Sequence, residues 1–131
     1  MNFASWTRAR LVGDSGITAL VSTRVTPYVR NRDADFPCIV YSIPREELTT
    51  PATGEVMHRD AEVQVSCMGR THLDADTIAE AVIVALGPGT DGTTCVDAVR
   101  VQSLDREYAD AYDGKPDLIY TTTVTAVLSG D

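Results

Sequence analysis

Two histidines and three cysteines are the side chains of this 131-residue sequence best suited to nucleophilic or metal chemistry. They are His58, His72, Cys38, Cys67 and Cys95. A zinc site needs three or four such ligands brought together, and neither a C-x-x-C pair nor a second histidine at ligand spacing supplies them. The residue types would allow a Cys–His nucleophile pair, but Cys38 and Cys67 lie in apolar stretches where burial suppresses thiol reactivity. We therefore expect no catalytic residue, no metal and no cofactor.

Carboxylates are the second group of candidates. They gather at Asp33 with Asp35, at Asp74 with Asp76, and along Asp105, Glu107, Asp110 and Asp113. Residues two apart on a helix do not face each other, so Asp74 and Asp76 are expected to favour the positive end of a helix instead. The acidic run 105–113 lacks the glycine and closing glutamate of an EF-hand loop, and we expect a solvated link, with metal binding as the alternative. The glycine-rich stretch 87–92 has no lysine and opens no helix, so phosphate binding is not expected.

The net charge of −8 argues against nucleic-acid binding, because phosphate backbones bind through clustered cations. Only Arg24, Arg30 and Arg32 approach a cluster. A duplex could still pass along an acidic surface, since repulsion prevents sticking. The hydrophobic fraction of 44% is that of a globular protein. No apolar run reaches the roughly 20 residues of a membrane-spanning helix, and no secretory signal is expected.

Three stretches carry apolar residues at helical spacing, and they are 3–12, 15–21 and 71–86. The third is the best defined. Thr71 is expected to cap its first turn, where the side-chain oxygen accepts a backbone N–H. Gly87 is expected to end it in the left-handed conformation, and Pro88 cannot continue it.

Five stretches have the composition of strands, and they are 25–29, 38–43, 60–68, 96–104 and 118–129. Pro27 places the first at a sheet edge. The third alternates most clearly, with Ala61, Val63, Val65 and Cys67 pointing one way. The order of elements predicts an α+β fold. We expect one domain over 1–131, built as a mostly antiparallel sheet of four to five strands with helices packed on one face.

Segments 45–59 and 105–117 are expected as polar connections. Most loops in compact domains run about 4–6 residues, so the first is long enough to form a projecting hairpin arm. Its apolar residues have little core to enter, and we expect an interface made by Glu46, Glu47, Leu48, Val56 and Met57. An arm and an open strand edge let a subunit reach its neighbour, and head-to-tail contacts close into rings. A monomer with a mobile loop is the alternative.

Sequence blocks along almost the entire chain resemble the tail-terminator, or tail-completion, proteins of long-tailed phages and phage-like particles. These blocks are LVGDSGITALVSTRVTPYV, DFPCIVYSI, AEVQVSCMGRTHLDADTIAEAVIVAL and IYTTTVTAVL. The resemblance implies a structural virion protein that forms a ring, expected to be a hexamer, on the head-proximal end of the tail tube. The ring would end tube polymerisation and offer a head-joining surface.

The resemblance also implies the partners. They are copies of the chain itself, the tail tube protein and the head–tail connector protein, with no membrane, and DNA passes through the lumen without specific binding. The implied location is the virion tail, and the host cytoplasm during assembly. Three alternatives stay open: a head–tail connector (stopper or neck) protein, a small cytosolic enzyme, and a monomeric binding module.

Overall fold

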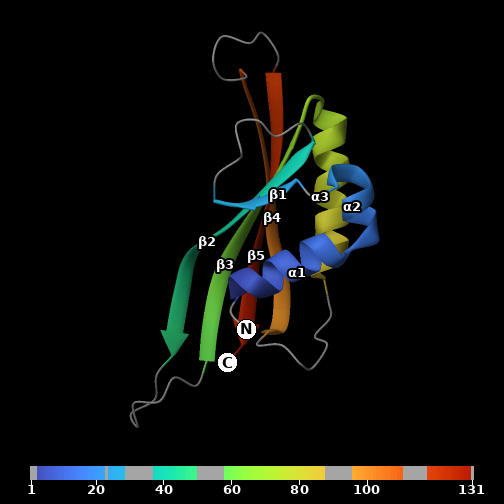
Figure 1. Cartoon of the computed structure of the whole chain (residues 1–131). Coiled ribbons are helices and arrows are strands. Elements are labelled where there is room, and N and C mark those ends of the chain that lie inside the picture. Colours follow the sequence, from blue (N-terminus) through green and yellow to red (C-terminus); the bar gives the residue numbers. More distant parts are fainter. Residues whose placement is uncertain are drawn as a thin grey trace.

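The computed structural model describes residues 3–22, 24–28, 37–49, 58–87, 96–110 and 118–130. Their elements follow in the order α1 (Phe3–Gly13), α2 (Ser15–Val21), β1 (Val25–Pro27), β2 (Cys38–Thr49), β3 (His58–Gly69), α3 (His72–Leu86), β4 (Val96–Asp110) and β5 (Leu118–Gly130). The strands form one open, mostly antiparallel sheet, and the helices pack against one side of it (Figure 1). The predicted α+β fold class is therefore confirmed.

The five strands lie in the order β1-β2-β3-β5-β4. Only β1 runs parallel to its neighbour, with Val25 opposite Ile39 of β2. The other pairs are antiparallel, and β3 lies at the centre between β2 and β5. The proline-containing strand β1 is an edge strand, as predicted, because Pro27 has no N–H to give to a further neighbour.

The alternation in β3 builds the centre of the core. Ala61, Val63, Val65 and Cys67 are fully buried, while the residues between them are half-buried. Successive side chains of a strand point to opposite faces, so one face of β3 meets the helices and the other does not. The predicted inward face of this strand is confirmed.

Helix α3 covers β3 and β5 with the apolar stripe that the sequence predicts. Its buried side chains include Ile78, Val82 and Leu86. Thr71 caps its first turn, accepting a hydrogen bond from the Asp74 backbone N–H at 3.1 Å. Helices α1 and α2 complete the layer, and their largest buried side chains are Phe3, Trp6, Leu11, Ile17 and Val21.

The end of α3 differs from the prediction. Gly87 has φ −80° and ψ 173°, which is extended backbone and not the left-handed conformation. Its N–H donates to the Ile83 carbonyl at 2.9 Å, and a Cβ placed on Gly87 would lie 2.9 Å from that same oxygen. Glycine is needed here for a close approach of backbone, and not for a positive φ.

Both segments predicted as polar connections begin as strand. β2 continues through Pro44 to Thr49, β3 starts at His58, and β4 continues to Asp110. Pro44 lies where the register with β3 shifts between Ser42 and Arg45, so its missing N–H removes no regular ladder bond. β2 bends along its length (Figure 1). The remaining parts of the two predicted connections, 50–57 and 111–117, lie outside the described residues.

Candidate functional site

Among the described residues, the groups best suited to catalysis do not form a catalytic pair or a metal site. Cys67 is fully buried, and burial, with a smaller effect of the nearby Cys38 thiol, raises the pKa of Cys67 far above its ordinary value. His72 stands in the first turn of α3, its ring 6.3 Å from that of Tyr120 in an edge-on arrangement. The His58 side chain and Cys95 lie outside the described part of the chain. Across that part, no group of three or more His, Cys, Asp or Glu side chains is arranged to hold a metal ion.

Asp76 has a more specific role than the one predicted for it. Its Oδ1 accepts a hydrogen bond from the Thr122 hydroxyl at 2.7 Å and from Arg106 Nε at 3.0 Å. The Thr122 hydrogen bond, followed by the Arg106 guanidinium and His72, holds the pKa of Asp76 below its ordinary value against an opposing effect of burial. Asp76 therefore ties α3 to both β5 and β4.

The acidic run that begins at Asp105 is strand, and the predicted solvated link is wrong there. Asp105 lies opposite Thr123, and Glu107 lies opposite Thr121 of β5. Arg106, between them, points to the helix side and reaches Asp76. Polar residues fill this strand because one of its faces is open to solvent, so composition alone suggested a connection.

The predicted interface residues Glu46, Glu47 and Leu48 lie together on the outer half of β2, which we call the arm (Arg45–Thr49). Glu47 pairs with Arg45 on the sheet face away from the helices. Glu46 pairs with Arg59 at 3.3 Å. Leu48 is 58% exposed, which is unusual for a large apolar side chain in a strand. The other two predicted residues, Val56 and Met57, lie outside the described residues.

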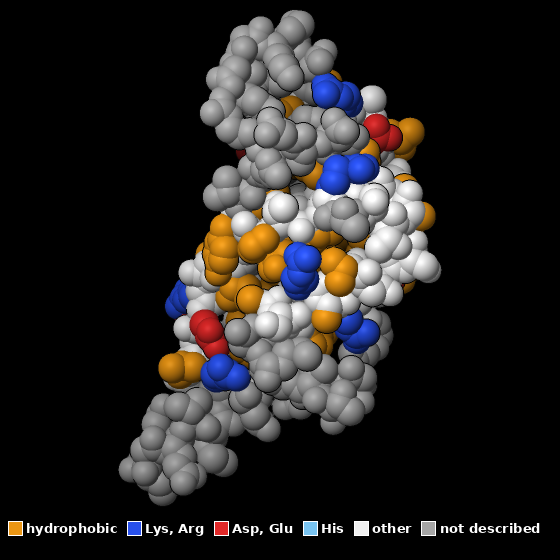
Figure 2. Space-filling model, viewed as in Figure 1, with side chains coloured by type: hydrophobic (Ala, Val, Ile, Leu, Met, Phe, Trp, Pro, Cys, Tyr) orange, Lys and Arg blue, Asp and Glu red, His pale blue; other side chains and the backbone are white. Residues whose placement is uncertain are grey.

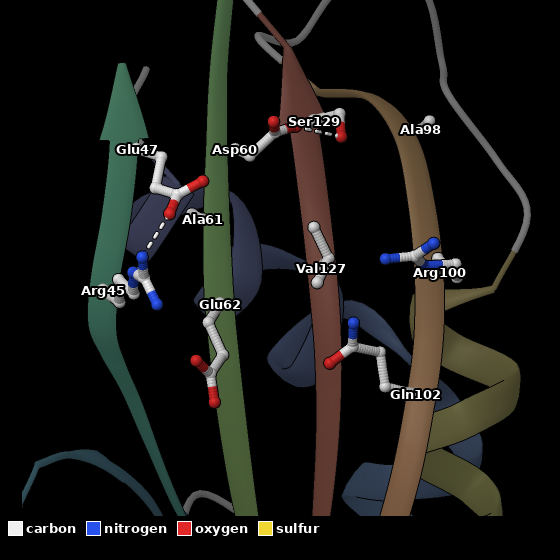
Figure 3. A pocket seen from close by; sticks show the side chains of 10 residues that line it. All are labelled: Arg45, Glu47, Asp60, Ala61, Glu62, Ala98, Arg100, Gln102, Val127 and Ser129. Carbon is white, nitrogen blue, oxygen red and sulfur yellow. Dashed lines mark hydrogen bonds and ion pairs between the residues drawn. The ribbon is translucent and has the colours of Figure 1, made fainter. Parts of the chain in front are cut away.

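The sheet face away from the helices is hollowed at the arm end (Figure 3). The hollow has a volume of about 670 Å³ and spans β2, β3, β5 and β4, with the helices behind the sheet. Its lining residues are Arg45, Glu47, Asp60, Ala61, Glu62, Ala98, Arg100, Gln102, Val127 and Ser129. Most of these are polar or charged, so the hollow is suited to contact with water or with a polar surface.

Hydrogen bonds keep the open face ordered across the strands. The Ser129 hydroxyl donates to Asp60 Oδ1 at 2.6 Å, and the hydroxyls of Ser66 and Thr123 lie 3.3 Å apart. Sequence reasoning did not single out Asp60 or Arg100. The available signal was the alternation within 96–104, which places Arg100 on the face opposite Val99 and Val101.

The two long sides of the sheet differ. β1 lies beside only Ile39–Tyr41 of β2, so no described strand borders the arm on its outer side. β4 ends the strand order at the other side, and no described strand borders the outer edge of its residues 98–110. An unpaired strand edge is a row of backbone donors and acceptors that a further strand can satisfy.

On the face drawn in Figure 2, the described cationic side chains are not gathered into one patch. Figure 2 shows hydrophobic side chains gathered about the middle of one face, with single Lys or Arg side chains spread among them. This agrees with the excess of acidic residues in the sequence. In the described ranges, every helix is too short or too polar to cross a membrane.

Comparison with known proteins relates this chain to a protein family and to solved structures. A family model described as "Tail completion protein gp17" matches residues 7–125. A solved chain from the structure titled "Virion of native gene transfer agent (GTA) particle" superposes with a TM-score of 0.56 at 17% identity, covering 95% of this chain and 92% of that one. At this identity the second match establishes a similar fold. No curated protein matches the sequence.

Proposed function

This chain belongs to the tail completion protein gp17 family, and we propose that it forms a ring on the head-proximal end of a phage tail tube. Membership confirms the family resemblance found in the sequence and makes the chain a phage tail structural protein. In the proposed role, the whole chain acts as one domain. The ring, which we expect to be a hexamer, ends tube polymerisation and presents a surface to the head–tail connector protein.

One observation carries this proposal: the sheet is open, with an exposed arm at one side and, at the other, the strand β4, whose outer edge no described strand borders at residues 98–110. Two different surfaces on opposite sides of a subunit allow head-to-tail contacts, which close into a ring when the rotation permits. The role is geometric and needs no catalytic residue. The proposed contacts to copies of the chain and to the tube include Glu46, Glu47 and Leu48, with Val56 and Met57.

The charge of the open face suits the passage of DNA. Glu47, Asp60 and Glu62 line the hollow together with Arg45 and Arg100, and the chain carries a net charge of −8. Specific DNA binding depends on clustered cations, so an acidic lumen lets a duplex pass without being held. The fold likeness to a chain of a gene transfer agent virion is consistent with a place in such a particle.

Negative-stain microscopy of the purified protein, with and without tail tubes, tests the proposal. We expect rings in the protein alone and a ring at one end of each tube. Tubes polymerised without the protein should grow past their normal length. Binding to portal-containing heads instead of tube ends would identify a neck connector and contradict the proposed role.

A further inference from the structure

The outer edge of β4 at residues 98–110 has no described strand beside it, and two residue types that block strand addition are absent from β4. Such edges are commonly blocked by lysine or proline. β1, the edge strand on the other side, contains Pro27, and β2 contains Pro44 where it leaves β1. β4 contains neither lysine nor proline over its whole length. Within Ala98–Val101 the single charged side chain is Arg100, so this part of the edge can accept a strand from another molecule.

We propose that the arm of one copy adds as an antiparallel strand to the β4 edge of the next copy, which deepens the proposed ring and rests on it. The strand directions support this pairing. β2 is antiparallel to β3, β3 to β5, and β5 to β4, so β2 and β4 run in opposite directions within one sheet. A neighbour that continues the sheet in the same orientation presents its β2 antiparallel to β4.

The arm and the matching part of β4 also lie at the same level of the sheet. Glu62 of β3 pairs with Arg45 on one side and with Val127 on the other, and Val127 pairs with Arg100. One step further, Glu47 reaches Ala98 through Asp60 and Ser129 in the same way. A closed ring has no translation along its axis. In the proposed ring the strands run along this axis. Rotation alone then brings the arm of one copy beside Ala98–Arg100 of the next copy.

This part of β4 is regular enough to accept a strand. Register shifts occur between Val96 and Ala98 and between Val101 and Ser103. Between these two irregularities, Ala98–Val101 pairs residue by residue with β5. Arg45–Thr49 pairs equally regularly with β3. Each partner of the proposed contact is therefore a short stretch of undistorted strand, as backbone hydrogen bonding requires.

The apolar side chains match on the helix side of the sheet. Val99 and Val101 are only partly buried at the margin of the core. Leu48 points to the same side of the sheet, since its neighbour Glu47 faces the hollow, and it is 58% exposed. Across a strand pair, such side chains come within contact distance. At this register Glu46 lies directly opposite Val99 and Leu48 lies diagonally from Val99, so the proposed pairing would cover Leu48 and Val99 together.

The charged side chains match on the opposite side. Arg100 is exposed, and no ion pair joins it to another described residue. It lines the same hollow as Glu47 and Arg45, which pair with each other (Figure 3). Long side chains on adjacent strands reach direct and diagonal neighbours. At this register Arg45 of the neighbouring copy lies directly opposite Arg100 of the first copy, and Glu47 lies diagonally from Arg100. Glu47 would then offset the repulsion between these two guanidinium groups.

A charge exchange tests the contact in sedimentation velocity of the full chain over a concentration series. Glu47→Arg places three arginines together and should raise the concentration needed for ring formation by about tenfold or more. Adding Arg100→Glu to the same chain should restore assembly, because one carboxylate again bridges two arginines. Mixing the Glu47→Arg chain with a chain carrying only Arg100→Glu should restore it as well. Circular dichroism verifies that each variant is folded.

The matched control is Glu47→Arg combined with Arg70→Glu, which has the same net charge but alters an exposed residue outside the contact. It should remain defective. Two outcomes would contradict the edge pairing without contradicting the ring. Either the Glu47→Arg chain forms rings as readily as the wild type, or Arg70→Glu restores assembly as well as Arg100→Glu does. If the wild-type chain stays monomeric at every concentration and does not bind tube ends, both the proposed ring and the edge pairing are contradicted.

Discussion

The two halves of β2 have opposite environments. Cys38–Tyr41 is buried throughout and lies between β1 and β3, whereas Arg45–Leu48 is exposed and pairs only with β3 among the described strands. The register shift at Pro44 separates them. The first half is apolar and the second carries charges and one exposed leucine. One strand thus contributes to the core at one end and to a surface available for contact at the other.

The largest effect is expected from a charge placed in the buried core against which the first half of β2 packs. Val65 is fully buried and lies between Tyr41 of β2 and Val124 of β5. Val65→Asp leaves an unpaired carboxylate there, which costs about 3–5 kcal/mol or more and should abolish cooperative folding. Val82→Asp on α3 should do the same from the helix side. Thermal unfolding followed by circular dichroism measures the loss.

Ser66→Asp provides the matched control for the sheet. Ser66 is the next residue along β3 and points to the open face, where it meets the Thr123 hydroxyl. The same new charge there remains hydrated, so we expect a change of about 1 kcal/mol or less. Equal thermal stability of Val65→Asp and the wild type would show that the inward face of β3 is assigned wrongly.

The second effect concerns the arm. Deleting 47–57 joins Glu46 to His58 and leaves His58–Asp60 as a short turn before Ala61, the register partner of Glu46. The described part of the deleted segment adds nothing to the buried core, so the free energy of unfolding should change little while ring formation is lost. Urea unfolding and sedimentation measure the two properties separately. If the deletion removes cooperative unfolding, the arm belongs to the core and the comparison between the halves of β2 fails.

The covered part of the molecule was largely predictable from its sequence. The alternation in β3 and the helical spacing in α3 both arise because one face of each element is buried. A shift of β3 by one residue would turn all its apolar side chains to solvent. The Thr71 cap was predictable for a local reason, because the acceptor and the N–H it receives are three residues apart. Glu46, Glu47 and Leu48 were singled out by the misfit of an apolar residue in a polar segment, and their place in an interface stays a prediction.

The remaining features depend on partners distant in sequence. Pro44 signalled the end of a strand, but the register shift that tolerates it is created by β3. Gly87 signalled a left-handed cap, but its need for glycine comes from the closeness of the Ile83 carbonyl. The polar end of β4 resembled a loop, because its pairing with the threonines of β5 is visible only after the sheet is formed.

The smallest effect concerns the contact between helix α3 and that polar end of β4. Asp76→Asn keeps the shape of the side chain but removes the charge that Thr122 and Arg106 bind. The Asp76 and Arg106 side chains are 32% and 59% exposed, so solvent screens the pair and we expect a loss of only about 1 kcal/mol at neutral pH. Urea unfolding of both proteins measures the difference.

The pH dependence of that difference identifies its origin. The pKa of Asp76 is lower in the folded protein than its ordinary value of 3.8, so the folded state binds this proton more weakly than the unfolded chain does. The stabilisation is therefore complete above the ordinary value and disappears as the pH falls through the lower folded pKa. Wild type and Asp76→Asn should converge in acid, whereas Asp74→Asn, which removes a charge without breaking these bonds, should show a smaller effect at neutral pH. A difference that is the same in acid and at neutral pH would mean that the shape of Asp76, and not its charge, holds α3 to β4 and β5.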